Sequence, residues 1–417
     1  MGTGLALAGL GFIAVATLTG SADSGRLARL TSLWCLVCGD EGGADVAANL
    51  LLFLPFAIGL RLSGVSWLRT VMVAAAVSFT VELLQFTVVT GRDASLSDLL
   101  TNTTSGAIGA AVAPSLPGMA SPGPRYAAAL LAGGSAAWLA VLSISAWLVA
   151  PGIPGGRLVS WWATGGDSSG DFGGRVRSVH FGGVALPENG PPPDPAALRR
   201  QLERDTFSLR ADVLSGKAAP DRRWIYVLQA GSARALALYQ LGRRAGVVMH
   251  VRGLRFKLRP VTLTLADGLP ALPGVPVRLE ATGRGRSLAL ASTYTGFQRL
   301  IELDISPALG WILLAPADLM AGSRIRWITA ACLAATLLVL GYWGGRSGRP
   351  KEAVVLLAAV LAGGLAAIPA LAGFPPVHWS EWLAGAAGAA AGWALGRPAA
   401  YLERRCASPS ASESSSS

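Results

Sequence analysis

Apolar and polar positions follow two different patterns along the chain. Uninterrupted apolar runs rich in Ala, Leu, Val and Gly occupy both ends, whereas the middle alternates apolar and polar residues with a period of two. A run of about 20 apolar residues can cross a membrane as a helix, and period-two alternation is typical of β-strands. The pattern therefore predicts a multidomain membrane protein that joins an all-α transmembrane bundle to an all-β domain.

About eight membrane spans are predicted from the apolar runs. They cover approximately 3–20, 47–62, 69–90, 99–116, 127–150, 325–343, 352–372 and 381–397. The second and fourth runs are short or polar at one end, so a re-entrant arrangement stays open for both. We expect a transmembrane core of about five helices over 1–150 and about three C-terminal helices over 325–400. The serine-rich tail, 401–417, has no apolar face and is expected to be disordered.

Basic residues in the short loops predict the orientation of these spans. The loops 61–69, 117–126 and 344–351 and the C-terminal tail all carry Arg or Lys, and counting spans places them on one side. Short basic loops mark the cytoplasmic side. We therefore expect a multi-pass protein of the plasma (inner) membrane with both termini in the cytoplasm and residues 151–324 outside it. The first run lacks a basic n-region and a small-x-small cleavage site, so an uncleaved helix is expected.

The middle segment, 151–324, is predicted to form an antiparallel sandwich. Its alternating runs are bounded by Gly, Pro, Asp or Ser, which favours strands joined by turns. The runs are RVRSVHF, TFSLRADV, RWIYVLQ, RALALYQL, GVVMHVR, VPVRLEA, RSLALAS and QRLIELDI. DPAALRRQLERD at 194–205 predicts one short helix, and the Gly/Pro-rich stretches 151–175 and 187–195 predict a linker and a loop.

Composition supports the membrane assignment. Of 417 residues, 52% are hydrophobic and only 14% are charged, and the mean hydropathy is +0.48. Ordinary soluble domains carry about 25% charged residues. We attribute much of the net charge of +11 to arginines beside the apolar runs. No basic stripe with interleaved aromatic residues is recognised, so no nucleic-acid partner is expected.

Cysteine and histidine predict neither a metal nor a cofactor. Cys35 and Cys38 form a CxxC pattern in the first outward loop, where a local disulfide is the favoured interpretation and two free thiols, a redox motif or half of a metal site are alternatives. The three histidines do not stand at ligand spacing from these cysteines.

Polar residues inside the apolar runs form the candidate site. Glu82 lies deep in the third run, and an isolated carboxylate at the centre of a membrane helix costs about 2.5–3.5 kcal/mol, so it needs a partner or a function. The spacing places the polar residues of each run on one helix face. Either they form an internal network that fixes helix register, or they line a pocket in which Arg92 holds a phosphate or carboxylate while Glu82 or Asp98 handles a proton. The candidate residues are Asp45, Asn49, Ser78, Glu82, Gln85, Arg92, Asp93, Ser95, Asp98 and Asn102.

These residues fall in three spaced motifs. They are D-x3-N-x3-F-x-P-x3-G from Asp45, S-x3-E-x2-Q from Ser78, and R-D-x-S-x2-D-x3-N-x3-G-x2-G from Arg92, which ends at Gly106 and Gly109. Over roughly 1–150 the chain resembles the VanZ-like membrane family, named after a protein associated with teicoplanin resistance. The resemblance implies a function at the cell envelope and carries no reaction with it. The two glycines are expected to allow close approach of a neighbouring helix.

The middle segment resembles a concanavalin A-like, laminin-G-type jelly roll, which some VanZ-like proteins carry as an insertion. That resemblance implies glycan binding on a shallow face. A few such domains hydrolyse glycosides with an E-x-D-x-x-E strand, whereas here Glu302 and Asp304 are followed by Pro307 at the third acidic position. Retaining hydrolysis needs both carboxylates, so we predict that Glu302 and Asp304 are solvent-facing residues of an edge strand.

Three functions stay open from the sequence. The first is an envelope protein whose core binds a lipid-linked or other amphiphilic molecule and whose sandwich binds a glycan or a protein partner. The second is a membrane enzyme that acts on a lipid or a lipid-linked glycan, and the third is a transporter or flippase-like protein that uses the same polar cluster.

Overall fold

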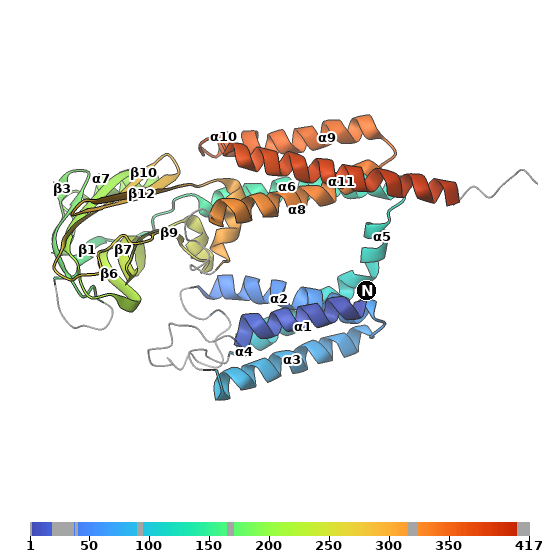
Figure 1. The fold of residues 1–417 in the computed structure, drawn as a ribbon, viewed down its shortest axis with the longest axis horizontal. Helices are drawn as coiled ribbons and strands as arrows, with labels where there is room; N and C mark the ends of the chain where they lie inside the picture. Colours follow the sequence, from blue (N-terminus) through green and yellow to red (C-terminus); the bar gives the residue numbers. More distant parts are fainter. Residues whose placement is uncertain are drawn as a thin grey trace, which may run out of the picture. The chain divides into compact units, whose positions relative to one another are not determined.

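A computed structural model describes residues 2–18, 37, 41–89, 95–164, 171–315 and 324–406, with side chains up to 397 (Figure 1). The chain forms two compact units. Unit 1 comprises Met1–Leu116, Leu148–Leu303 and Trp311–Gly322, and unit 2 comprises Pro117–Trp147, Asp304–Gly310 and Ser323–Ser417. Unit 1 therefore holds both the first helices and the β-strands.

Four helices of unit 1 pack through small residues. They are α1 (Gly2–Leu18), α2 (Gly42–Leu62), α3 (Trp67–Thr87) and α4 (Leu96–Val112), followed by the 3₁₀ turn η1 (Ala113–Ser115). A Cβ added to Gly106 would overlap the Ala74 side chain, and one added to Gly109 would overlap that of Ala57. The predicted close approach of helices at Gly106 and Gly109 is confirmed.

Two six-stranded antiparallel sheets make up the β part of unit 1 (Figure 1). The first has the order β4-β1-β6-β7-β8-β9 and the second the order β12-β11-β10-β5-β2-β3. The first sheet consists of β1 (Leu158–Trp162), β4 (Asn189–Gly190), β6 (Ala219–Ala230), β7 (Ala233–Gly242), β8 (Arg244–Met249) and β9 (Val261–Leu265). The second consists of β2 (Arg175–Phe181), β3 (Val184–Ala185), β5 (Thr206–Leu214), β10 (Pro276–Arg284), β11 (Ser287–Tyr294) and β12 (Phe297–Asp304). The 3₁₀ turns η2 (Arg252–Phe256) and η3 (Pro307–Leu313) follow β8 and β12.

Most of the predicted β region is confirmed. All eight alternating runs contain strands, and the predicted helix is α7 (Pro195–Glu203), which begins where the Asp194 carboxylate accepts a hydrogen bond from the Ala197 amide at 2.8 Å. The linker predicted over 151–175 is wrong, because β1 lies within it and pairs with β4 and β6. The loop predicted over 187–195 contains the two-residue strand β4, and β9 is a strand that the runs did not include.

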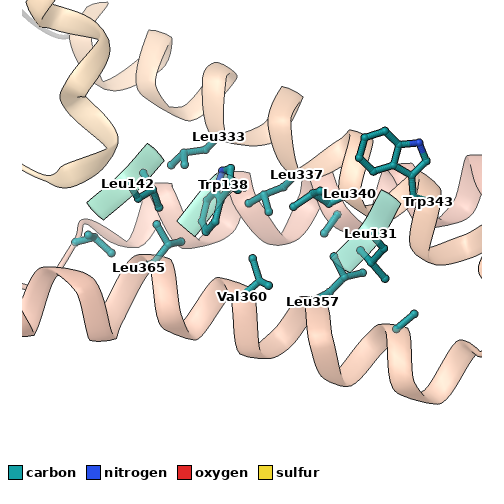
Figure 2. Close-up of a cluster of buried hydrophobic side chains, with 13 residues drawn as sticks. Leu131, Trp138, Leu142, Leu333, Leu337, Leu340, Trp343, Leu357, Val360 and Leu365 are labelled. Carbon is teal, nitrogen blue, oxygen red and sulfur yellow. The ribbon is translucent and has the colours of Figure 1, made fainter. Parts of the chain in front are cut away.

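Unit 2 is a group of helices around a continuous apolar core. Its elements are α5 (Leu116–Ala120), α6 (Pro124–Val149), α8 (Arg324–Arg346), α9 (Pro350–Ala362), the π turn η5 (Gly363–Ala367), α10 (Ile368–Leu371) and α11 (Trp379–Cys406). Figure 2 shows Leu131, Trp138 and Leu142 of α6 packed in one cluster with leucines of α8 and α9. Helix α6 therefore packs with α8 and α9, whereas the sequence grouped it with the helices that precede it.

Five helical segments in the described part of the chain are long and apolar enough to cross a membrane. They are α2, α3, α6, α8 and Pro350–Leu371, and α1 is a shorter apolar helix. Every predicted span coincides with a helix, but the count of eight spans and the orientation of the chain stay predictions.

Candidate functional site

Polar side chains join the first four helices to one another. We call six of them the polar ladder: Asn49, Ser78, Glu82, Gln85, Asp98 and Asn102. Asn49 Nδ2 of α2 donates to Asp98 Oδ1 of α4 at 2.8 Å, and Asn102 Nδ2 of α4 donates to Ser78 Oγ of α3 at 3.0 Å. Gln85 Nε2 of α3 donates to the Thr17 carbonyl oxygen of α1 at 3.0 Å. The ladder thus connects all four helices, whereas the sequence placed the polar residues of each run on one face and left their partners open.

Glu82 finds its partner at the beginning of α4. Its Oε2 accepts a hydrogen bond from the Ser95 amide at 2.7 Å, and Ser95 is the residue that caps α4, with its Oγ accepting from the Ser97 amide at 3.1 Å. The first amides of a helix lack partners inside the helix, and the helix dipole favours a negative charge there. The carboxylate that the sequence left unexplained is thereby stabilised by a backbone donor and a helix terminus.

Exposure varies among the ladder residues, and four of the six, Ser78, Glu82, Gln85 and Asn102, are buried. Asn49 and Asp98 are half-buried, whereas Ser78 and Asn102 are 0% and 2% exposed. The Oδ1 atom of Asn102 is buried and has no hydrogen-bond partner among the described residues. The Ser78 hydroxyl can donate or accept a hydrogen bond. If the Asn102 amide were rotated by 180°, its oxygen would accept from Ser78 and its nitrogen would then be the atom without a partner. The ladder therefore retains an unused hydrogen-bonding group at its buried end.

Asp45 has a different partner from the ladder. Its Oδ1 lies 2.9 Å from Nη2 of Arg259, a residue between η2 and β9, and Arg259 Nε lies 3.2 Å from Oε2 of Glu41. In addition, the Lys257 carbonyl oxygen accepts hydrogen bonds from the Gly43 and Ala44 amides at 3.0 and 3.2 Å. We call Glu41, Asp45, Lys257 and Arg259, with these contacts, the latch. It caps the beginning of α2 with a segment of the β region.

Sequence reasoning missed the latch. The spacing of Asp45 and Asn49 correctly placed both on α2, but an ion-pair partner 214 residues away leaves no local pattern. The only signal was the cluster of basic residues at 252–259, which the predicted sandwich left without a role.

Other predicted site residues fall outside the described part of the chain. Arg92, Asp93, Cys35 and Cys38 are in this group, so the predicted anion contact and disulfide stay predictions. Within the described residues, no group of three or more His, Cys, Asp or Glu side chains is arranged to hold a metal ion. Glu302 and Asp304 are exposed on β12, which is an edge strand, as predicted.

A comparison with protein families bears on the helices that carry the ladder. Residues 13–117 match the VanZ/LLP1 family model. This VanZ-like segment includes every residue of the ladder and ends before α6. No curated protein and no solved structure matches the chain. The two antiparallel sheets are present, but their concanavalin A-like identity stays a prediction. The VanZ-like segment and the five apolar helices together indicate a membrane protein of the cell envelope.

Proposed function

We propose that the VanZ-like segment binds the polar headgroup of a lipid-linked or other amphiphilic envelope molecule along the polar ladder, and that the β region binds a glycan of the same envelope. The unpaired amide atom of Asn102 carries the first part of this proposal. A buried polar group without a partner costs about 1–3 kcal/mol. A ligand hydroxyl or amide that reached it would recover that free energy.

The arrangement of the ladder supports entry from the half-exposed end. Asn49 and Asp98 are half-buried and lie next to each other, so a headgroup could exchange hydrogen bonds with them before reaching Asn102. An acyl chain would remain beside the apolar outer faces of the helices, where Phe79, Leu83 and Phe86 of α3 are exposed. Such faces suit a molecule that is polar at one end and apolar at the other.

Native mass spectrometry of the purified full chain tests this proposal. We expect the wild-type protein to retain a lipid from an envelope extract, and Asn102→Leu to lose most of it. Thr103→Val is the matched control, because the Thr103 hydroxyl donates to the Leu99 carbonyl of its own helix. Asp98→Asn removes charge while keeping the shape of the side chain, so it is the second variant if Asn102→Leu fails to fold.

The alternative interpretation makes a different prediction for the same variants. If the ladder serves only to fix helix register, Asn102→Leu and Asp98→Asn will shift the melting temperature in detergent and still bind lipid as the wild type does. Equal lipid retention by wild type and both folded variants would contradict the proposal.

Enzyme and transport functions stay predictions for the same residues. Glu82→Gln should abolish turnover of a lipid-linked substrate in folded protein if Glu82 transfers a proton in a reaction. A transporter should move its substrate across proteoliposomes under an imposed gradient. The cell-envelope setting of the VanZ-like segment suits both, and the association with glycopeptide resistance also stays a prediction.

A further inference from the structure

The positive charge of the chain is concentrated in its β region. Residues 151–315 hold 21 of the 35 basic residues and only 12 of the 24 acidic ones. The sequence-based assignment of much of the charge to loops beside the spans is therefore wrong. A surface rich in one sign of charge raises the local concentration of ligands with the opposite charge, so the β region is expected to attract anions.

Two of these arginines share one indole ring on the first sheet. The guanidinium carbon of Arg234 on β7 lies 4.6 Å from the centre of the Trp224 ring, and that of Arg222 on β6 lies 5.8 Å from it. Arg222 also lies 4.8 Å from the centre of the Tyr239 ring. Trp224 and Tyr239 are themselves in edge contact at 6.1 Å. We call Arg222, Trp224, Arg234 and Tyr239 the arginine platform.

Strand geometry explains how the platform forms. Trp224 pairs with Tyr239 across β6 and β7, whereas Arg234 pairs with Gln229 farther along the same strands. The Arg234 side chain must therefore run along the sheet to reach Trp224. Trp224 itself packs against an apolar patch on this sheet, in which Val227, Ala237, Tyr239 and Val248 are buried. The aliphatic stem of an arginine can cover such a surface while its charged end stays in water.

Cation–π contact holds each guanidinium carbon over an aromatic ring. A guanidinium packed face-on against an aromatic ring still directs its N–H groups outward in its own plane, where they match two oxygens of a carboxylate or phosphate. Neither Arg222 nor Arg234 has a carboxylate within ion-pair distance among the described residues, whereas Arg223 pairs with Asp221 at 3.1 Å. Two like charges beside one ring repel each other, and an anion between them would relieve that repulsion.

We propose that the arginine platform binds a saccharide chain that carries repeated carboxylate or phosphodiester groups. The proposal rests on the proposed function, since it specifies which glycan the β region recognises. The half-buried Trp161 lies across from Val227 and packs against the same apolar patch, so it offers an aromatic surface for a sugar ring next to the charged groups. Charge selects an anionic chain, and the aromatic surface selects one made of sugars.

Binding of labelled octamers to the purified full chain tests this proposal in nanodiscs of neutral lipid. The four probes are octagalacturonate, a glycerol-phosphate octamer, neutral malto-octaose and octaglutamate, which is anionic but contains no sugar. We expect at least one of the first two to bind about tenfold more tightly than either of the others, and added salt to weaken its binding. Whichever anionic chain binds better identifies the charged group as carboxylate or phosphodiester.

Variants separate the platform from general charge. Arg222→Gln and Arg234→Gln should each lower the affinity for the preferred octamer about tenfold, because each removes a charged hydrogen-bond donor. Trp224→Leu should lower it as well without changing charge, because it removes the ring that orders both arginines. Arg284→Gln is the matched control, since Arg284 is exposed on β10 of the other sheet, and it should change affinity less than twofold. Melting curves establish that each variant is folded.

Several results would overturn the proposal. Equal binding of malto-octaose would show a neutral-glycan site, which leaves the proposed function intact but removes the role of charge. Equal binding of octaglutamate, or an equal loss in Arg284→Gln, would show that only net charge matters. Binding of none of the octamers by folded wild-type protein would contradict both the platform and glycan binding by the β region, while lipid retention by the VanZ-like segment would be unaffected.

Discussion

Replacing Arg259 tests how strongly the β region holds the beginning of α2. Arg259→Gln removes both ion pairs of the latch and leaves the hydrogen bonds to the Lys257 carbonyl in place. The Arg259 side chain is only 16% exposed, whereas those of Glu41 and Asp45 are 43% and 54% exposed. The perturbation is therefore the loss of a mostly buried cation from two well-hydrated carboxylates.

The exposure of the carboxylates limits the size of the effect. Ion pairs with exposed partners contribute about 0–1 kcal/mol each, because water and salt screen them. Two such pairs to one ordered guanidinium give about 1–1.5 kcal/mol, which corresponds to roughly a tenfold change in the local opening equilibrium. We expect this loss at the first turn of α2 and little change in the rest of the helix.

Hydrogen exchange measured by mass spectrometry reads this local equilibrium directly. Amides in a peptide that begins at Gly42 should exchange about tenfold faster in Arg259→Gln, and Asp45→Asn should give part of the same effect. The double variant should be less affected than the sum of the two single variants, because they remove a shared contact. Arg199→Gln is the control, since Arg199 donates to the Pro154 and Gly156 carbonyls within the β region.

The reasoning would be refuted by either of two results. Unchanged exchange at the first turn of α2 in Arg259→Gln would mean that the ion pairs contribute nothing to its order. An equal acceleration in Arg199→Gln would mean that any loss of stability in the β region loosens α2, with no particular role for Arg259.

Two further predictions concern stability. Burial raises the pKa of Asp205, and the Arg286 amide and charge oppose this shift only in part. The protonated Asp205 carboxyl therefore stabilises the fold below the ordinary pKa near 3.8, and this stability is lost as pH rises through the folded-state pKa. Between about pH 4 and pH 7, the melting temperature of Asp205→Asn should therefore rise relative to that of the wild type. A difference in melting temperature that does not change with pH would contradict this prediction. In unit 2, a Cβ at Gly392 would overlap the Leu338 carbonyl. Gly392→Ala should lower the free energy of unfolding by about 1–3 kcal/mol. Gly133→Ala is the control, because Gly133 faces open space on α6 and its replacement should cost nothing. Equal melting temperatures for the two variants would show that α8 and α11 tolerate wider spacing.

Local patterns predicted a large part of this fold. The lengths of the apolar runs predicted the helices, and the period-two alternation predicted eight strands. Asp194 and Pro195 marked the beginning of α7. These features depend on neighbours within a few residues, which is the range over which propensity and periodicity act. The shared faces of the ladder were predictable for the same reason.

Features set by distant contacts were not predictable in this way. LVSWW of β1 lies in a Gly/Pro-rich stretch and is a strand because it pairs with β6, 64 to 72 residues away. The apolar run of α6 does not indicate which helices it will meet, since all of them are equally apolar. Arg222 and Arg234 are ordinary charged positions in sequence, and only the register of β6 and β7 brings both to Trp224.

The latch also imposes an order on biogenesis. Asp45 and Arg259 are 214 residues apart, and a ribosome that adds roughly 5–20 residues per second needs about 10 to 40 s to cover that distance. During this interval the first helices are already made while the β region is still emerging, so the beginning of α2 lacks its ion-pair partner and the Lys257 cap. The first four helices therefore stay incompletely assembled until the β region has folded. A truncated chain that ends before η2 should therefore be an early substrate for membrane proteases.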